Sequence, residues 1–207
     1  MIVRASPDTR RGCSIIIATA LFCSLCTGVS ANAAEIKLSD LRGYSIDAEW
    51  IYNRRYTRVE TSGQRKRSNS SKRFVDKIYI SKTGRIFHRR QLYPDTTSRK
   101  PLWSYDNIRG RRSESFEWGP SSTFIHRSIP SDDKERTNYT RIVRIALSKS
   151  NGSYSCSVRA SLALQKGKKQ FKQYEPSGRY TIIHSYKARQ KSCRVYKGNV
   201  FKGEVGP

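Results

Sequence analysis

The stretch RIVRIALSKSNGSYSCSVRASLAL, residues 141–164, decides the fold class of this chain. Apolar residues alternate with polar or small ones over residues 143–147, and the alternation resumes over residues 154–164. A period of two is the pattern of a strand with one buried face. Between the two halves, Asn151-Gly152 supplies two residues that tolerate the positive φ of a type I′ turn. The stretch therefore predicts an antiparallel β-hairpin.

The rest of the chain also predicts strands. Residues 43–52 place Tyr44, Ile46, Ala48, Trp50 and Tyr52 on one face. A second hairpin is expected from residues 74–80 and 85–90, joined by the turn SKTG, and further strands from residues 122–128, 179–186 and 193–196. Residues 53–71 are expected to end in a mobile loop, because their second half lacks apolar side chains. Residues 91–121 predict one or two short strands with long loops, and AEIKLSD before the first strand looks like a linker.

No segment carries the i, i+3, i+4, i+7 apolar pattern of a long helix, and about eight strands in one domain indicate a barrel or a sandwich. We favour a single antiparallel up-and-down β-barrel, because consecutive hairpins suit it and closure removes exposed edges; the alternative is a β-sandwich. The chain resembles in outline small exported barrels of the lipocalin-like kind, whose first strand also carries a Gly and a Trp. Here Gly43 and Trp50 stand farther apart than in that family, and the resemblance implies architecture without a ligand or a site.

Residues 1–33 have the three parts of a secretory signal peptide. Arg4, Arg10 and Arg11 precede an apolar core, and Ala31-Asn32-Ala33 offers a small-x-small cleavage site. An uncleaved membrane anchor is the alternative, but the hydroxyl residues in the apolar run and the site after it favour cleavage near Ala33. We therefore expect one all-β domain over residues 34–207, located in the periplasm or secreted, with no transmembrane segment.

Two of the five cysteines remain after this cleavage, Cys156 and Cys193. Both occupy apolar-facing strand positions, and an exported chain with two cysteines most economically forms one disulfide. Such a bond would contribute roughly 3–4 kcal/mol in the chain-entropy model. A catalytic or metal-binding pair is disfavoured, because CxxC spacing and nearby histidines are both absent.

The motifs of catalysis are weak. His88, His126 and His184 lack the HxxxH or HExxH spacing of metal ligands, so neither a metal nor a cofactor is predicted. His184 is the best site candidate, since alternation places it with Tyr180, Ile182 and Tyr186, facing into a barrel. Glu114 and Glu117 beside Trp118 could be the two acids of a glycosidase, but in so basic a chain we expect them to pair with Arg109, Arg111 or Arg112. On balance we expect a protein that is not an enzyme.

Positive charge is the clearest functional signal: 41 Lys and Arg face 16 Asp and Glu, for a net charge of +25. Such an excess indicates an anionic partner or serves solubility alone. An exported protein meets lipopolysaccharide, anionic membrane surfaces and acidic polymers more often than nucleic acid. We therefore predict a noncatalytic module that binds an anionic surface component or a small ligand, with a secreted polysaccharide hydrolase as the alternative. The predicted binding residues, in arginine-rich loops and at His184, are Arg65, Lys66, Arg67, Arg73, Arg109, Arg111, Arg112 and His184.

Overall fold

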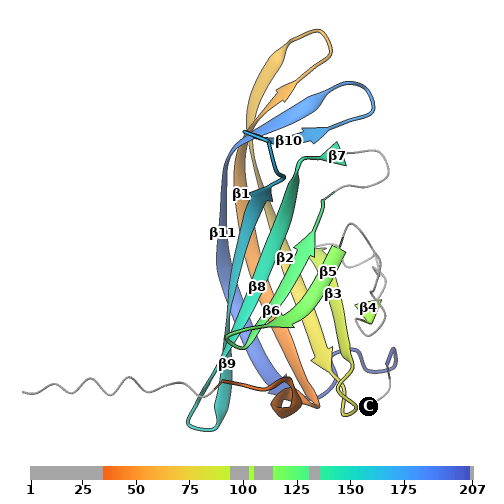
Figure 1. Cartoon of the computed structure of the whole chain (residues 1–207), viewed down its shortest axis with the longest axis vertical. Helices are drawn as coiled ribbons and strands as arrows, with labels where there is room; N and C mark the ends of the chain where they lie inside the picture. The colour runs from red at the N-terminus through yellow and green to blue at the C-terminus, as the bar shows by residue number, and fades with distance from the viewer. Residues whose placement is uncertain (1–34, 94–102, 105–113, 131–135, 206–207) are drawn as a thin grey trace, which may run out of the picture. The chain divides into compact units, whose positions relative to one another are not determined.

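The computed structural model describes residues 35–93, 103–104, 114–130 and 136–205, which form two antiparallel β-sheets (Figure 1). The predicted signal peptide lies outside these residues. The first sheet has the order β4 (Trp103–Ser104), β3 (Ile86–Tyr93), β2 (Arg65–Ile80), β1 (Tyr44–Val59), β11 (Tyr180–Lys197), β10 (Phe171–Tyr174) and β7 (Arg136–Thr137). The second has the order β5 (Glu114–Gly119), β6 (Thr123–Ser128), β8 (Tyr139–Ser150) and β9 (Ser153–Leu164). The predicted all-β, barrel-or-sandwich architecture is confirmed.

The hairpin that decided the fold class is β8–β9. Its strands pair without interruption from Tyr139 opposite Leu164 to Ser150 opposite Ser153. Asn151 and Gly152 connect them with φ of 49° and 77°, the positive values that a type I′ turn requires. The second predicted hairpin is β2–β3, in which Gly84 has φ of 88° in the turn after Ile80.

A shared core lies between the two sheets. Ile46, Ala48 and Trp50 of β1 are fully buried, and β2 adds Phe74 and Ile78. The second sheet contributes the apolar face of its central hairpin: Val143, Ile145, Leu147 and Val158. Alternation along each strand therefore sends one face into the core, as the sequence predicted for residues 44–52 and 141–164.

The sheets are joined at two seams. Strands β9 and β11 lie side by side without a backbone ladder, and the disulfide Cys156–Cys193 links them, as predicted. Near it, the backbone N–H of Val158 donates to Oε1 of Gln190 at 2.6 Å. At the other seam, His88 of β3 stacks on Phe116 of β5, with ring centroids 4.8 Å apart. Side chains, rather than strand pairing, thus hold the two sheets together.

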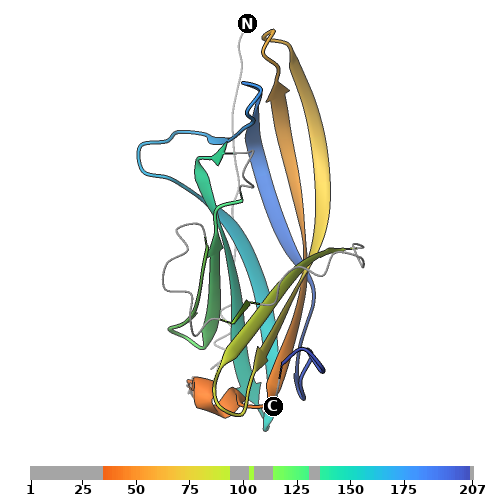
Figure 2. The same cartoon turned by 90° about the vertical axis from the view of Figure 1, so that its right-hand side faces the viewer.

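The structure corrects the loop that was predicted in the second half of residues 53–71. Most of this segment belongs to the two long strands β1 and β2, which pair continuously from Ser45 opposite Tyr79 to Val59 opposite Arg65. Only residues 60–64 form the turn. Backbone hydrogen bonds do not need apolar side chains, so a polar segment can extend a strand when its neighbour continues beside it. Figure 2 shows β1, β2 and β11 running together toward this turn.

The two predicted strands at residues 179–186 and 193–196 are a single strand, β11. It pairs with β1 along its whole length, and the register shifts twice, opposite Glu49/Trp50 and opposite Arg55/Tyr56. These bulges interrupt the alternation on which the prediction of two short strands relied. The described part of the chain nevertheless holds more strands than the eight or so expected, because it also includes the short strands β4, β7 and β10.

The segments flanking the sheets pack onto them. The expected linker before β1 forms a short 3-10 helix, Leu38–Leu41, in which Leu41 is fully buried. After β11, Phe201 is buried and the guanidinium of Arg89 lies 5.2 Å from its ring centroid. Within the described ranges, no helix has the length and apolar character needed to cross a lipid bilayer.

Candidate functional site

A polar surface lies on the outer face of the first sheet. Because Trp50 and Tyr52 point into the core at even positions of β1, Asn53 and Arg55 point away from it. The pairing of β1 with β2 and β11 places side chains of all three strands beside one another on this face. They form two cross-strand rows: Ser71, Asn53 and Lys187, then Asn69, Arg55 and Ser185.

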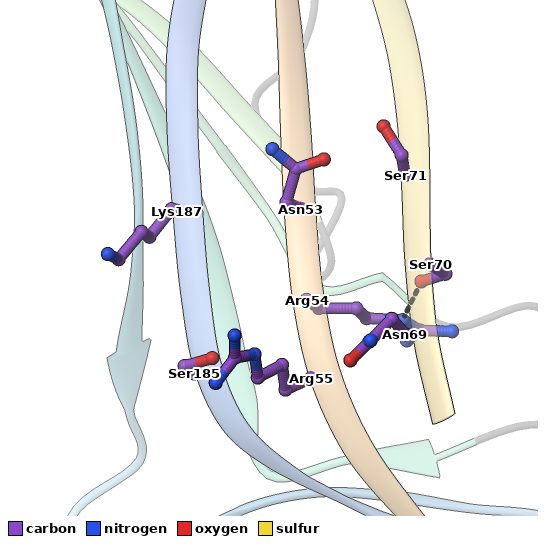
Figure 3. Close-up of a pocket in the computed structure, with 8 residues that line it drawn as sticks. All are labelled: Asn53, Arg54, Arg55, Asn69, Ser70, Ser71, Ser185 and Lys187. Carbon is purple, nitrogen blue, oxygen red and sulfur yellow. Dashed lines mark hydrogen bonds between the residues drawn. The ribbon is translucent and has the colours of Figure 1, made fainter. Parts of the chain in front are cut away.

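These two rows line a hollow of about 700 Å³ (Figure 3). An adjoining hollow of about 460 Å³ shares Arg55 and Asn69 and extends to Arg67 and His184. We call the combined depression the outer groove. Its residues on this face are Asn53, Arg55, Arg67, Asn69, Ser71, His184, Ser185 and Lys187.

The groove is cationic. Arg55, Arg67 and Lys187 are exposed, and none of them has a carboxylate partner among the described residues. The polar side chains between them, amides and hydroxyls, can both donate and accept hydrogen bonds. No acidic residue lines either hollow in the described part of the chain. The groove thus combines fixed positive charge with hydrogen-bonding groups on a rigid three-stranded platform.

His184 reaches this groove because of a bulge. Ser185 pairs with Arg55 and Ile183 pairs with Tyr56, so His184 is the unpaired residue between them. It is exposed, and its Nε2 lies 2.7 Å from Oγ1 of Thr57. The prediction that His184 points into a barrel is therefore wrong, since the bulge shifts the alternation on which that prediction rested.

The other predicted binding residues separate into three groups. Arg65, Lys66 and Arg67 are exposed, but they lie on β2 rather than in a loop, and only Arg67 lines the groove. Arg73 pairs with Glu49, and its hydrogen bond lowers the pKa of that carboxyl. Arg109, Arg111 and Arg112 lie outside the described residues. Arg55 and Lys187 were not among the residues predicted for the site, because only the strand register places them on the same face as Arg67.

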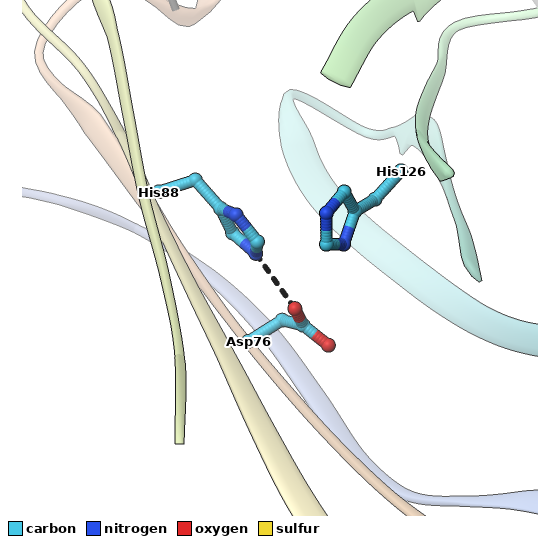
Figure 4. A group of neighbouring side chains, drawn as sticks. All are labelled: Asp76, His88 and His126. Atoms are coloured by element: carbon cyan, nitrogen blue, oxygen red, sulfur yellow. Dashed lines mark hydrogen bonds and ion pairs between the residues drawn. The ribbon is translucent and has the colours of Figure 1, made fainter. Parts of the chain in front are cut away.

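A second polar group lies at the seam between the sheets: Asp76 of β2, His88 of β3 and His126 of β6, which we call the Asp76 cluster (Figure 4). All three residues are buried, with exposed fractions of 3% or less. Oδ1 of Asp76 lies 2.6 Å from Nε2 of His88, and Nε1 of Trp50 donates to Oδ2 at 2.7 Å. The sequence offered one signal for it, an acidic residue at an inward position between Phe74 and Ile78.

Electrostatics keep Asp76 ionised in this setting. Burial by itself would raise its pKa, but the charge of Arg90, whose Nε donates to Oδ1 at 2.9 Å, and the hydrogen bond with His88 outweigh burial and hold the pKa far below its usual range. Burial, reinforced by the nearby charge of Arg90, lowers the pKa of His126 to about 4. His126 is therefore neutral near pH 7 and donates from Nε2 to Glu114.

The Asp76 cluster has the side chains of a metal site, and its ligand atoms lie within 4.8 Å of one another. Its hydrogen bonding argues against that use. Asp76 already accepts from three donors, on Trp50, His88 and Arg90, and the guanidinium of Arg90 would repel a divalent cation. The arrangement is better explained as a charged clamp that ties β2, β3 and β6 together.

The two glutamates considered as a catalytic pair lie on opposite faces of β5. Glu114 bonds to the buried His126, whereas Glu117 pairs with Arg127 at the surface. Three residues along a strand place two side chains on opposite faces, so these carboxylates do not converge on one bond. The expected arginine partners, Arg109, Arg111 and Arg112, lie outside the described residues. His184, on the outer face of another strand, does not join the glutamates.

Comparison with known proteins adds no further identification. No known protein family matches the chain, and neither a curated protein nor a solved structure matches it significantly.

Proposed function

We propose that this protein is a noncatalytic, extracytoplasmic binding module that holds an acidic polysaccharide in the outer groove. The observation that carries the proposal is the convergence of Arg55, Arg67 and Lys187, exposed and without carboxylate partners in the described ranges, in one depression of polar side chains. The disulfide between β9 and β11 is compatible with a location outside the cytoplasm.

The geometry suits a polymer better than a single ion. Side chains two residues apart on a strand repeat about every 6.6 Å, so the successive rows present donors at regular intervals along β1. Amides and hydroxyls alternate with the cations, and these groups can bond to sugar hydroxyls while the cations neutralise carboxylates or sulfates. A lipopolysaccharide core carries the same anionic sugar chemistry.

The direct test compares dextran sulfate with neutral dextran of the same length, by isothermal titration at increasing salt. We expect binding of dextran sulfate only. The triple variant Arg55→Gln, Arg67→Gln and Lys187→Gln should bind about tenfold or more weakly at low salt, with a salt slope reduced by about 2–3, because up to three ion pairs are lost.

The matched control removes three exposed cations elsewhere: Arg144→Gln and Arg159→Gln on the second sheet and Lys82→Gln in the β2–β3 turn. It has the same net charge as the groove variant and should keep most of the affinity. Equal losses of affinity in both variants would contradict recognition by the groove and would show that only the overall charge of the protein matters. Equally tight binding of anionic vesicles or single-stranded DNA would show that the protein binds polyanions in general, with no selectivity for polysaccharides.

A further inference from the structure

Several buried side-chain donor atoms have no hydrogen-bond partner in the described part of the chain, and three of them belong to residues that contact the inward aromatic rings of β1. These three are Nε of Arg141 on β8, the hydroxyl of Tyr186 on β11 and Nη2 of Arg90 on β3. A buried donor without an acceptor lowers the stability of the fold, and does so more strongly when it is charged. Native folds retain few such atoms, and a group that meets them from outside the chain is one explanation.

These donors come from both sheets and face the same region. The guanidinium of Arg141 lies 5.7 Å from the ring centroid of Tyr52 and 5.5 Å from that of Phe74. The ring of Tyr52 also stacks against Tyr186, at 5.2 Å between centroids. Arg141 of the second sheet therefore sits over an aromatic wall that β1, β2 and β11 of the first sheet provide.

The electrostatics of this region favour a bound anion. Burial, together with the charge of Arg90, lowers the pKa of Arg141, while burial raises the pKa of Tyr186 to about 12. Arg90 is neutralised by Asp76, but no carboxylate pairs with Arg141 among the described residues. Arg141 is half-buried and its Nε is fully buried, so a guanidinium there that lacks a carboxylate partner in the described ranges carries a desolvation cost that a bound anion would offset.

We propose that Arg141, Tyr186 and Arg90 form an interior site for an amphiphilic organic anion, with the acidic group on these donors and the apolar body against Tyr52 and Phe74. A carboxylate, phosphate or sulfonate fits equally, because each presents oxygens that can accept from the guanidinium and the phenol at once. The site is separate from the outer groove, which lies on the opposite face of β1.

The probe that tests the site is 1-anilinonaphthalene-8-sulfonate, whose fluorescence rises in apolar surroundings, displaced by decanoate or by decanol. Decanoate should displace it at a concentration about tenfold or more below that of decanol, since a charge-assisted hydrogen bond is worth at least that factor. Inorganic phosphate, which lacks the apolar body, should displace it poorly. Equal potency of decanoate and decanol would overturn the proposal.

Variants assign the effect to the site. Arg141→Met should abolish the preference for decanoate, and Tyr186→Phe, which removes only the hydroxyl, should weaken decanoate binding several-fold. Arg144→Gln, on the same strand but exposed on the other face, should behave as the parent. A preference for decanoate that survives Arg141→Met would exclude this site.

Folding is checked by thermal melting of each variant without ligand. Arg141→Met should melt at or above the temperature of the parent, because it replaces a half-buried charge that has no carboxylate partner in the described ranges with an apolar side chain, which relieves a desolvation penalty. A large drop in melting temperature would show that Arg141 serves the fold, and would contradict the proposal even if binding were lost. The isosteric Tyr186→Phe variant gives an independent measure of binding in a folded protein.

Discussion

Buried side chains of the Asp76 cluster make the stability of this fold depend on acidity. His126 has a pKa of about 4 in the folded protein and an ordinary value of 6.5 when exposed. Between these values the unfolded chain binds a proton that the folded protein does not, so stability decreases as the pH falls through this window. The lowered pKa values of Asp76 and Glu114 add to the loss only at lower pH, below their ordinary values of 3.8 and 4.5.

We expect the free energy of unfolding to fall by roughly 3 kcal/mol between pH 6.5 and pH 4, as the shift in pKa implies. Urea denaturation at half-unit steps of pH measures it. The variant His126→Gln should lose most of this decrease in unfolding free energy above pH 4.5. The control variant His184→Gln, which replaces an exposed histidine, should show the same decrease as the parent. A slope that is unchanged in His126→Gln would assign the acid sensitivity to other groups.

The same cluster yields a prediction about metal ions. Because the carboxylate of Asp76 already accepts three hydrogen bonds and lies beside Arg90, we expect Zn²⁺ in tenfold excess at pH 7.5 to leave the melting temperature unchanged. Differential scanning fluorimetry with and without Zn²⁺ measures the melting temperature for this comparison. A saturable increase that disappears in Asp76→Asn would instead identify a metal centre.

At the scale of elements, the junction of β9 and β11 depends on the disulfide. These strands have no backbone ladder between them, so the bond from Cys156 to Cys193 and the contact from Gln190 to Val158 carry the link. The bond spans 37 residues, for which the chain-entropy model gives about 3–4 kcal/mol.

Replacing both cysteines by serine should therefore lower the free energy of unfolding by about 3–4 kcal/mol in urea denaturation. Amide exchange should accelerate most in β9 and in the adjoining half of β11, where the seam opens. Reductant should destabilise the parent and leave the double variant unaffected. Equal stability of the two proteins would show that packing across the seam suffices without the bond.

Elements also differ in how far the sequence predicts them. The hairpin β8–β9 follows from local alternation and an Asn-Gly turn, and the structure confirms it residue by residue. The outer halves of β1 and β2 have no such signal, because their side chains are polar and only the backbone ladder defines them. In β11, bulges displace His184 from its expected face, and bulges have no reliable signature in a single sequence.

At the scale of the whole molecule, both candidate sites arise from strands distant in the sequence. The outer groove combines residues of β1, β2 and β11. The separate interior site combines Arg141 of β8 and Arg90 of β3 with Tyr186 of β11. A surplus of arginines in the sequence indicated an anionic partner, but not which arginines converge. Selecting them requires the strand register and the seams, which are long-range contacts.

By itself, the sequence determined the all-β class, the central hairpin, the inward faces of residues 44–52 and 141–164, and the pairing of Cys156 with Cys193. These features follow from alternation, turn chemistry and the number of cysteines, all of which are local or countable. Only the tertiary structure decided that His184 faces outward, that Asp76 meets two histidines, and that Nε of Arg141 lies buried with no carboxylate partner among the described residues. Those outcomes depend on bulges and on how one sheet packs against the other, and in a single sequence no local pattern encodes them.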